Sequence, residues 1–153
     1  MRAIIHTRFA EPADALAPAE VPAPEVGPGE VLVRVRAVGL ARGDWLIARG
    51  LPYVARPMYG IRTPKETIAG QVLAGVVEGV GAGVTRFSEG DEVFGWGTAT
   101  LAELAAVPAD QLAPKPPGVT LEQAAAVPVS GFAALQAVRD QGEAAAGQRV
   151  LVI

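Results

Sequence analysis

The chain has no cysteine and only one histidine, His6, among its 153 residues. The lack of cysteine excludes a disulfide framework and a thiolate metal site, and it makes a reducing compartment the expected location. A lone imidazole with no carboxylate pair near it in the sequence provides too few ligands for a zinc site. We therefore expect no bound metal, and we expect His6 to be an ordinary strand residue.

Charge is also sparse, since only 19% of the residues are charged and the net charge is -3. Lysine and arginine are scattered singly and form no basic stripe, which argues against nucleic acid as a partner. No apolar run approaches the roughly 20 residues of a membrane span, and the first residues lack the apolar core of a signal peptide. Because half of the residues are hydrophobic, we expect a folded, soluble, cytoplasmic protein without a membrane partner.

Glycine and proline, by contrast, are abundant, with 18 and 13 residues spread along the whole chain. This distribution suits short strands joined by turns. Within residues 30–40, valines alternate with Arg34 and Arg36, the pattern of a half-buried strand whose arginines face water. The first two-thirds of the chain is expected to be mainly β, with further strands within residues 2–7, 70–87, 90–97 and 100–110.

One short helix and one long loop are expected inside this β-rich region. Residues 43–50 favour a helix in which Asp44 is the N-cap and Gly50 ends the last turn. Residues 51–67 are rich in Pro, Arg and Tyr, and a connection of this length usually has a functional role.

The glycines of "GVGAGV", residues 79–84, superficially match a dinucleotide-binding fingerprint. That fingerprint requires a helix immediately after it, whereas turn and strand signals follow here. We therefore interpret Gly79, Gly81 and Gly83 as turn and bulge positions.

The last third of the chain changes character. Thr120 and Gln123 form a capping box, and residues 130–142 carry apolar side chains at 132, 135 and 138, so two helices are predicted in succession. The final run "GQRVLVI", residues 147–153, is typical of a buried strand. Two helices followed by such a strand indicate the entry to an α/β domain.

The order of these signals resembles one family. The segments that carry the likeness are "VGLARGDW", "AGQVLAGVVEGVGAGVTRFSEGDEVFGWG", "LAELAAVPADQLAPKPPGVTLEQAAAVPVSGFAALQAV" and "GQRVLVI". They resemble the N-terminal, GroES-like domain of the medium-chain dehydrogenases and reductases, most closely the zinc-independent quinone oxidoreductases. The resemblance implies a partly open GroES-like β-barrel over residues 1–118. Residues 119–153 would then be a helical connection and the first strand of a truncated NAD(P)-binding Rossmann domain.

The resemblance also implies a chemistry and a set of site residues. The family's zinc-ligand positions fall at Ala41, Gln71 and Val129, which are not usual zinc ligands, so reduction without zinc is expected. The substrates implied are quinones, enones or related carbonyl compounds, and NADPH or NADH is the implied cofactor of the full-length relative. The residues implied to line the substrate pocket are Ala41, Trp45, Gln71, Trp96 and Ser130.

Two further residues have open roles. Tyr53 is the candidate catalytic residue, because its phenol, like that of Tyr59 in the same loop, can donate to an enolate or phenolate oxygen; the alternative is that both pack on the barrel surface. Ala133 is the candidate cofactor-binding position. Related reductases often carry Asn at the position of Ala41 and Thr at that of Ala133, so both positions depart from the family pattern. Trp45 and Trp96 can also be read as scaffold residues.

Three functions stay open from the sequence. The first is the substrate-side domain of an NAD(P)H-dependent oxidoreductase, inactive as this isolated chain. The second is a stand-alone GroES-like binding or interaction module. The third is one part of a split enzyme, in which the run 150–152 forms an apolar edge completed by a partner, and exposed strand edges can also favour self-association.

Overall fold

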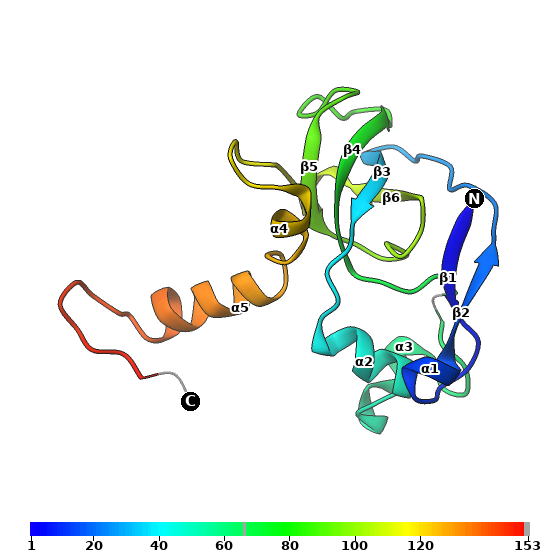
Figure 1. Cartoon of the computed structure of the whole chain (residues 1–153), viewed down its shortest axis with the longest axis horizontal. Helices are drawn as coiled ribbons and strands as arrows, with labels where there is room; N and C mark the ends of the chain where they lie inside the picture. The colour runs from blue at the N-terminus through cyan, green and yellow to red at the C-terminus, as the bar shows by residue number, and fades with distance from the viewer. Residues whose placement is uncertain (66, 152–153) are drawn as a thin grey trace.

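The computed structural model describes residues 1–65 and 67–151. Its largest element is a five-stranded antiparallel sheet with the strand order β6-β3-β4-β5-β7 (Figure 1). The expectation of a mainly β fold is confirmed. The strands of this sheet are β3 (Glu30–Ala37), β4 (Val72–Val80), β5 (Glu92–Trp96), β6 (Leu104–Pro108) and β7 (Leu112–Pro114).

A second, two-stranded sheet is formed by the start of the chain. Its elements are β1 (Arg2–His6), helix α1 (Pro12–Ala15) and β2 (Leu16–Glu20), with β1 and β2 antiparallel. Single bridges pair Ala3 with Ala102 and Ile5 with Ile68, and so attach β1 to segments that flank the large sheet. Over the described part of the chain the two sheets do not close into one continuous barrel, as the expected partly open arrangement requires.

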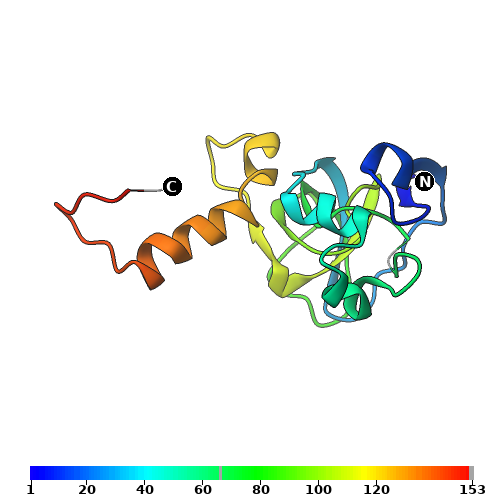
Figure 2. The ribbon, with the colours of Figure 1, turned by 90° about the horizontal axis from the view of Figure 1, so that it is seen from below.

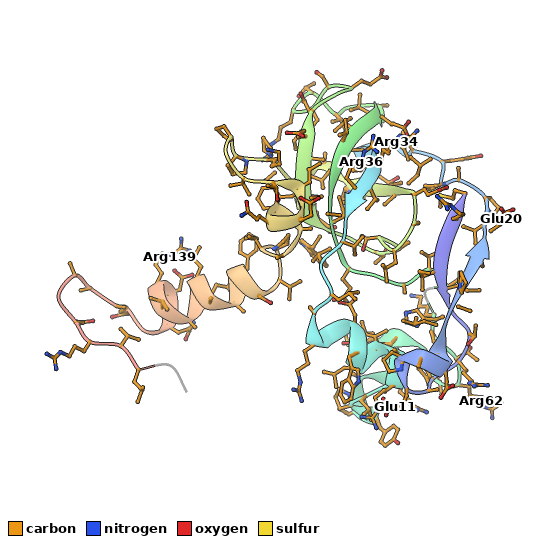
Figure 3. The ribbon with its side chains drawn as sticks, viewed as in Figure 1. Glu11, Glu20, Arg34, Arg36, Arg62 and Arg139 are labelled. Carbon is orange, nitrogen blue, oxygen red and sulfur yellow. The ribbon has the colours of Figure 1, made fainter. Side chains whose placement is uncertain are left out.

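The main core cluster lies on one face of the large sheet, and a smaller cluster with α4 lies on the other. Val31 and Val33 of β3 are fully buried, whereas Arg34 and Arg36 are exposed, as the alternation predicted. Figure 3 shows these two arginines together at β3. Burying a valine or leucine side chain contributes about 1.5–3 kcal/mol, so the valine-rich strands stabilise this half of the molecule. The core cluster consists of Val31, Val33, Leu73, Val77, Phe87, Val93, Ala105, Val107 and Leu112.

The glycines at 79, 81 and 83 lie where β4 ends and the chain turns back toward β5. The register between β3 and β4 shifts between Leu32 and Val33, which places an irregularity beside Gly79. A Cβ on Gly81 would collide with the backbone oxygen of Gly27 in the loop before β3, and Gly83 has a φ of 84°. A strand and not a helix follows, which confirms the interpretation of these glycines as turn and bulge positions.

Helix α2 (Arg42–Arg49) begins earlier than the sequence indicated. Its N-cap is Ala41, and Asp44 occupies the third helical position, where its Oδ2 accepts a hydrogen bond from the Ala41 N–H at 2.8 Å. The prediction of Asp44 as the N-cap is therefore wrong. The true N-cap, Ala41, has no capping side chain by which the sequence could have identified it. Gly50 ends the helix in the left-handed conformation, as predicted.

Residues 51–67 are more structured than predicted. They contain a 3-10 turn, Tyr53–Ala55, and the short helix α3 (Arg56–Tyr59). Proline in the first turn of a helix loses no intrahelical hydrogen bond, so Pro57 is compatible with α3 although it suggested a loop in the sequence.

The capping box predicted in the last third is present at helix α4 (Leu121–Ala125). Thr120 Oγ1 accepts from the Gln123 N–H at 3.2 Å, and Gln123 Oε1 accepts from the Thr120 N–H at 3.0 Å. The second predicted helix is α5 (Ser130–Leu135), which continues as a π-helix over Gln136–Gln141. These two elements, residues 130–141, form a helical arm that extends away from the sheets (Figures 1 and 2).

The strand predicted for the final run is not formed by Val150 and Leu151, which belong to no secondary-structure element. Strands are stabilised by hydrogen bonds to a neighbouring strand, and none of the strands in residues 1–65 and 67–151 pairs with these two residues. Val152 and Ile153 lie outside the described residues. In the part of the chain that the structure describes, no helix is long and apolar enough to span a bilayer.

Candidate functional site

A partly enclosed cavity of about 230 Å³ lies between β1, α2, α3 and the segments that precede β4 and β6. Its apolar wall residues are Leu16, Leu40, Ile47, Met58, Pro64, Ile68, Ala69, Ala99 and Leu101. Its polar side chains are His6, Asp44, Tyr59, Gln71 and Thr98. Apolar walls with a few polar groups are the usual composition of a small-molecule site.

Gln71 is held in this cavity by the backbone on both sides. Gly70 has a φ of 96°, and a Cβ there would lie 2.5 Å from Thr100 Oγ1, so only glycine allows this close approach. The Gln71 carbonyl accepts a hydrogen bond from the Gly97 N–H at 2.7 Å. Its side-chain Oε1 would lie 3.3 Å from a Cβ on Gly43, which places the amide against the first turn of α2.

His6 and Asp44 both line the cavity, and their charges interact. Burial lowers the pKa of His6 below its ordinary value, and the Asp44 carboxylate opposes part of this shift. Burial likewise raises the pKa of Asp44, although the hydrogen bond from the Ala41 N–H acts in the opposite direction. The Nδ1 atom of His6 is buried and has no hydrogen-bond partner among the described residues.

A smaller crevice of about 110 Å³ adjoins the cavity on the other side of Leu40, which lines both hollows. A Cβ on Gly39 would collide with the carbonyl oxygen of Ala125, so this glycine allows α4 to pack closely against the sheet. The residues that line the crevice are Gly39, Leu40, Ala41, Val72, Ala125, Ala126, Val129 and Ser130. Ser130 carries the only polar side chain among them.

Three of the predicted substrate-pocket residues therefore line these hollows. Ala41 and Ser130 face the crevice, whereas Gln71 faces the cavity. Trp45 is not among the lining residues of either hollow, and the guanidinium of Arg49 lies 4.5 Å above its ring. Trp96 is 50% exposed near the end of β5. The roles of these residues in binding stay predictions.

Tyr53, the candidate catalytic residue, is 70% exposed and lies against Arg56, whose guanidinium is 4.7 Å from the centre of its ring. The tyrosine that lines the cavity is Tyr59. Ala133, the candidate cofactor-binding position, is exposed on α5. Neither Tyr53 nor Ala133 adjoins the two hollows, and the function of both stays a prediction.

The three positions that match zinc ligands in the family line two neighbouring hollows that share Leu40. Ala41 and Val129 line the crevice, and Gln71 lines the cavity. Among residues 1–65 and 67–151, no group of three or more His, Cys, Asp or Glu side chains lies close enough together to hold a metal ion.

Sequence reasoning did not bring His6, Asp44, Tyr59 and Thr98 together in one cavity, although it allowed Tyr59 as a phenol donor and Asp44 as a pocket-orienting residue. These residues come from four segments that only the folded chain brings together. The available signal was weak: a histidine in an apolar strand, and an aspartate at the start of a helix that was interpreted as its cap.

The alcohol dehydrogenase GroES-like domain is the family whose model matches this chain, over residues 27–117. The pikromycin polyketide synthase component PikAII of Streptomyces venezuelae is 39% identical over 135 residues, which are 88% of this chain and 3% of that protein. The chloroplastic quinone-oxidoreductase homolog of Spinacia oleracea is 35% identical over 142 residues, covering 90% of this chain and 42% of the homolog.

Among solved structures, the quinone oxidoreductase from Coxiella burnetii matches with a TM-score of 0.85 and 28% identity, covering 96% of this chain and 46% of that one. The chain thus spans less than half the length of the relatives it matches. Since the domain match covers most of the large sheet and α2, and since the fold agrees over nearly the whole chain, the chain belongs to the alcohol dehydrogenase GroES-like domain family of the medium-chain dehydrogenases and reductases.

Proposed function

We propose that this chain is the substrate-side domain of a zinc-independent, NAD(P)H-dependent oxidoreductase that reduces quinones, enones or related carbonyl compounds. The observation that supports the proposal is the pair of hollows on either side of Leu40, with Gln71 in one and Ala41 and Ser130 in the other. The relatives named quinone oxidoreductase support the same substrate class.

The chemistry of this proposal depends on hydrogen-bond donors near the substrate oxygen. When an enone or quinone is reduced, negative charge develops on that oxygen, and donors already in place there stabilise it. Several donors line the two hollows, and among them the Gln71 amide and the Ser130 hydroxyl belong to residues predicted to line the substrate pocket.

The crevice beside Ala41 does not by itself provide the groups that a dinucleotide cofactor requires. A dinucleotide carries phosphates, which are usually bound by backbone N–H groups at a helix N-terminus or by cationic side chains. The crevice beside Ala41 has only the Ser130 hydroxyl as a polar side chain and no cationic group. Binding of NADPH or NADH would therefore require phosphate-binding groups beyond those that line the crevice, and we propose that the 153-residue chain alone is inactive.

A chimeric enzyme tests the proposal. Residues 1–153 replace the corresponding N-terminal segment of the Coxiella burnetii quinone oxidoreductase, and oxidation of NADPH or NADH is followed with 1,4-benzoquinone and with an enone. We expect turnover by the chimera and none by the isolated chain. Gln71→Leu in the chimera should lower kcat about tenfold or more, as expected for the loss of one oxyanion donor.

Two results would contradict the proposal. A folded chimera that binds the cofactor, as shown by quenching of the dihydronicotinamide fluorescence, but reduces none of the substrates would refute the assigned reaction. Turnover by the pure 153-residue chain would refute its inactivity. Val80→Thr is the matched control. Val80 is partly exposed at the end of β4 and lines neither hollow, so this substitution should leave kcat unchanged.

A second candidate, one part of a split enzyme, is favoured by the apolar side chains of the arm. Phe132, Leu135 and Val138 recur at intervals of three residues and are all exposed. Purification of the tagged chain from its host should then recover a nucleotide-binding protein in stoichiometric amount, and recovery of the chain alone would refute this candidate.

A further inference from the structure

Exposed apolar side chains gather in two segments, the helical arm with the residues beside it and the segment 40–65, which contains α2 and α3. We call the second segment the α2–α3 lobe, and Figure 1 shows its two helices together at one end of the molecule. Large apolar side chains gathered on a surface usually mark a site of contact with another surface. The exposed apolar residues of the lobe are Leu40, Trp45, Tyr53, Val54, Met58 and Ile61.

The lobe also differs from the rest of the chain in its charge. Residues 40–67 contain five cationic and two anionic residues, whereas the remaining residues contain eight cationic and fourteen anionic ones. Arg49 pairs with Glu11 of α1 at 2.9 Å. Arg42, Arg62 and Lys65 are exposed, and Figure 3 shows Arg62 at the same end of the molecule as α2 and α3. The lobe is therefore a net positive segment of a chain whose remainder is net negative.

The cavity opens at this lobe. Leu40 and Met58 line the cavity, yet their side chains are 74% and 72% exposed. Side chains that line a cavity and are mostly exposed lie at its mouth, which is thus between the start of α2 and α3. Pro64 also lines the cavity, and it directly precedes the exposed Lys65. The opening therefore lies among apolar side chains with cations beside it.

A lipid surface with anionic headgroups matches these features. Arginine and lysine are attracted to anionic headgroups, and tryptophan and tyrosine, here Trp45 and Tyr53, are enriched at membrane interfaces. An apolar opening suits a contact surface that is itself apolar, as the acyl region of a bilayer is. Two copies of the chain that met through the same lobe would instead bring like charges together, which is unfavourable.

We propose that the α2–α3 lobe docks on an anionic lipid surface, with the mouth of the cavity facing the lipid. Its exposed apolar side chains enter the boundary between headgroups and acyl chains, and Arg42, Arg62 and Lys65 contact the headgroups. Only one consequence rests on the proposed function, namely that an apolar quinone or enone passes from the bilayer into the cavity. The sequence predicted no membrane partner because no apolar run can span a bilayer, but docking at the surface needs no such run.

Binding of the 153-residue chain to lipid vesicles tests the proposal without any cofactor or substrate. The probes are vesicles of phosphatidylcholine alone and vesicles that also contain about 30% phosphatidylglycerol, and the bound fraction is measured by flotation. The chain should bind the anionic vesicles about tenfold or more tightly than the neutral ones, because each Lys or Arg near such a surface contributes about 1 kcal/mol. Added sodium chloride should weaken this binding.

A pair of charge variants assigns the binding to the lobe. Arg62→Gln combined with Lys65→Gln should lower the affinity for anionic vesicles about tenfold or more, since two cations leave the contact. Arg36→Gln combined with Arg139→Gln is the matched control, because it removes the same charge from exposed positions outside the lobe. Its affinity should stay within about twofold of that of the original chain.

A second pair separates the lobe from the other exposed apolar segment. Val54→Ser combined with Ile61→Ser should weaken vesicle binding about tenfold, because two apolar side chains no longer enter the lipid. Leu135→Ser combined with Val138→Ser makes the same kind of change in the helical arm and should leave the affinity within about twofold. All four side chains are exposed, so both variants should keep the fold.

The two tryptophans report which surface meets the lipid. Trp96→Phe leaves Trp45 of the lobe as the single tryptophan, and Trp45→Phe leaves Trp96 of β5. In anionic vesicles with brominated acyl chains, which quench nearby indole fluorescence, Trp45 should be quenched more strongly than Trp96. Equal quenching, or stronger quenching of Trp96, would contradict docking through the lobe.

Other outcomes would also overturn the proposal. These are no binding to anionic vesicles, equal binding to neutral vesicles, unchanged affinity in both lobe variants, and self-association that the Val54 and Ile61 substitutions abolish, which would assign the lobe to a second copy. Failure of the proposed function is measured separately, as turnover by the chimera. An active chimera without vesicle binding refutes only docking, and vesicle binding with an inactive chimera refutes only the reaction.

Discussion

Strand β4 and the helical arm are both rich in apolar residues, yet they differ in almost every structural respect. Leu73 of β4 is 0% exposed, because it packs in the core cluster with residues such as Val33 and Val93. Leu135 of the arm is 47% exposed, and its neighbours Phe132 and Val138 are exposed as well. Apolar composition alone therefore does not stabilise a segment, since the stabilisation comes from the surface that covers it.

The largest effect expected from this difference is on the free energy of unfolding when leucine is replaced by alanine in each of the two regions. Leu73→Ala should lower the free energy of unfolding by about 2–5 kcal/mol, because it opens a cavity in the core of the sheet. Leu135→Ala should lower it by less than about 0.5 kcal/mol, as for a surface change that leaves no cavity. Urea unfolding of both variants measures the difference, and equal losses would show that the arm is packed in solution.

A pair of glycines tests where the packed region ends. Gly39→Ala should cost about 1–3 kcal/mol, because the new methyl group would collide with the Ala125 carbonyl and with Val72 and push α4 from the sheet. Gly79→Ala is the matched control, since a Cβ there meets no atom within 4 Å. Thermal unfolding should therefore change little for Gly79→Ala, and a neutral Gly39→Ala would show that α4 is not held against the sheet.

A smaller effect is expected at the capping box that begins α4. Thr120→Ala removes the acceptor of the Gln123 N–H and should cost about 1 kcal/mol. Thr120→Ser keeps that hydroxyl and should restore most of the loss. Amide hydrogen exchange would show faster exchange at Gln123 and Ala124 in Thr120→Ala with unchanged protection in β4, and uniform loss of protection would mean that cap and sheet unfold together.

The smallest effect is a pH dependence caused by His6. Because burial lowers its pKa in the folded chain from the ordinary 6.5, the unfolded chain binds more protons as the pH falls below about 6.5, and stability should decrease there. Above this pH both states are neutral and the contribution of His6 is constant. The slope between pH 7.5 and 5.5 should be shallower in His6→Leu, and an identical slope would contradict a buried imidazole.

The features that could be predicted from the sequence are those set by neighbouring residues. The alternation around Arg34 and Arg36 is a property of one strand, and the exchange between Thr120 and Gln123 takes place within one helical turn. The glycines after β4 were interpretable because the residues that follow them exclude a helix. In each case, the physical cause lies within a few positions of the residue concerned.

The missed features depend on contacts between distant segments or on residues without a signal. The N-cap of α2 is Ala41, which no capping preference identifies, so Asp44 was assigned that place. The cavity brings His6 of β1 together with residues of α2, α3 and two loops, and no local pattern records that meeting. Strand β7 is short and runs into a proline-rich stretch, and its pairing with β5 decided its conformation.

The position of the single histidine also makes this chain unusually simple to observe. The Cε1 proton of His6 is the only imidazole proton of its kind in the molecule, so a one-dimensional proton spectrum should contain one such resonance free of overlap from other histidines. Because the ring lines the cavity, its chemical shift reports occupancy of that cavity directly. Libraries of small molecules can therefore be screened against unlabelled protein, with assignment and the location of the site known in advance.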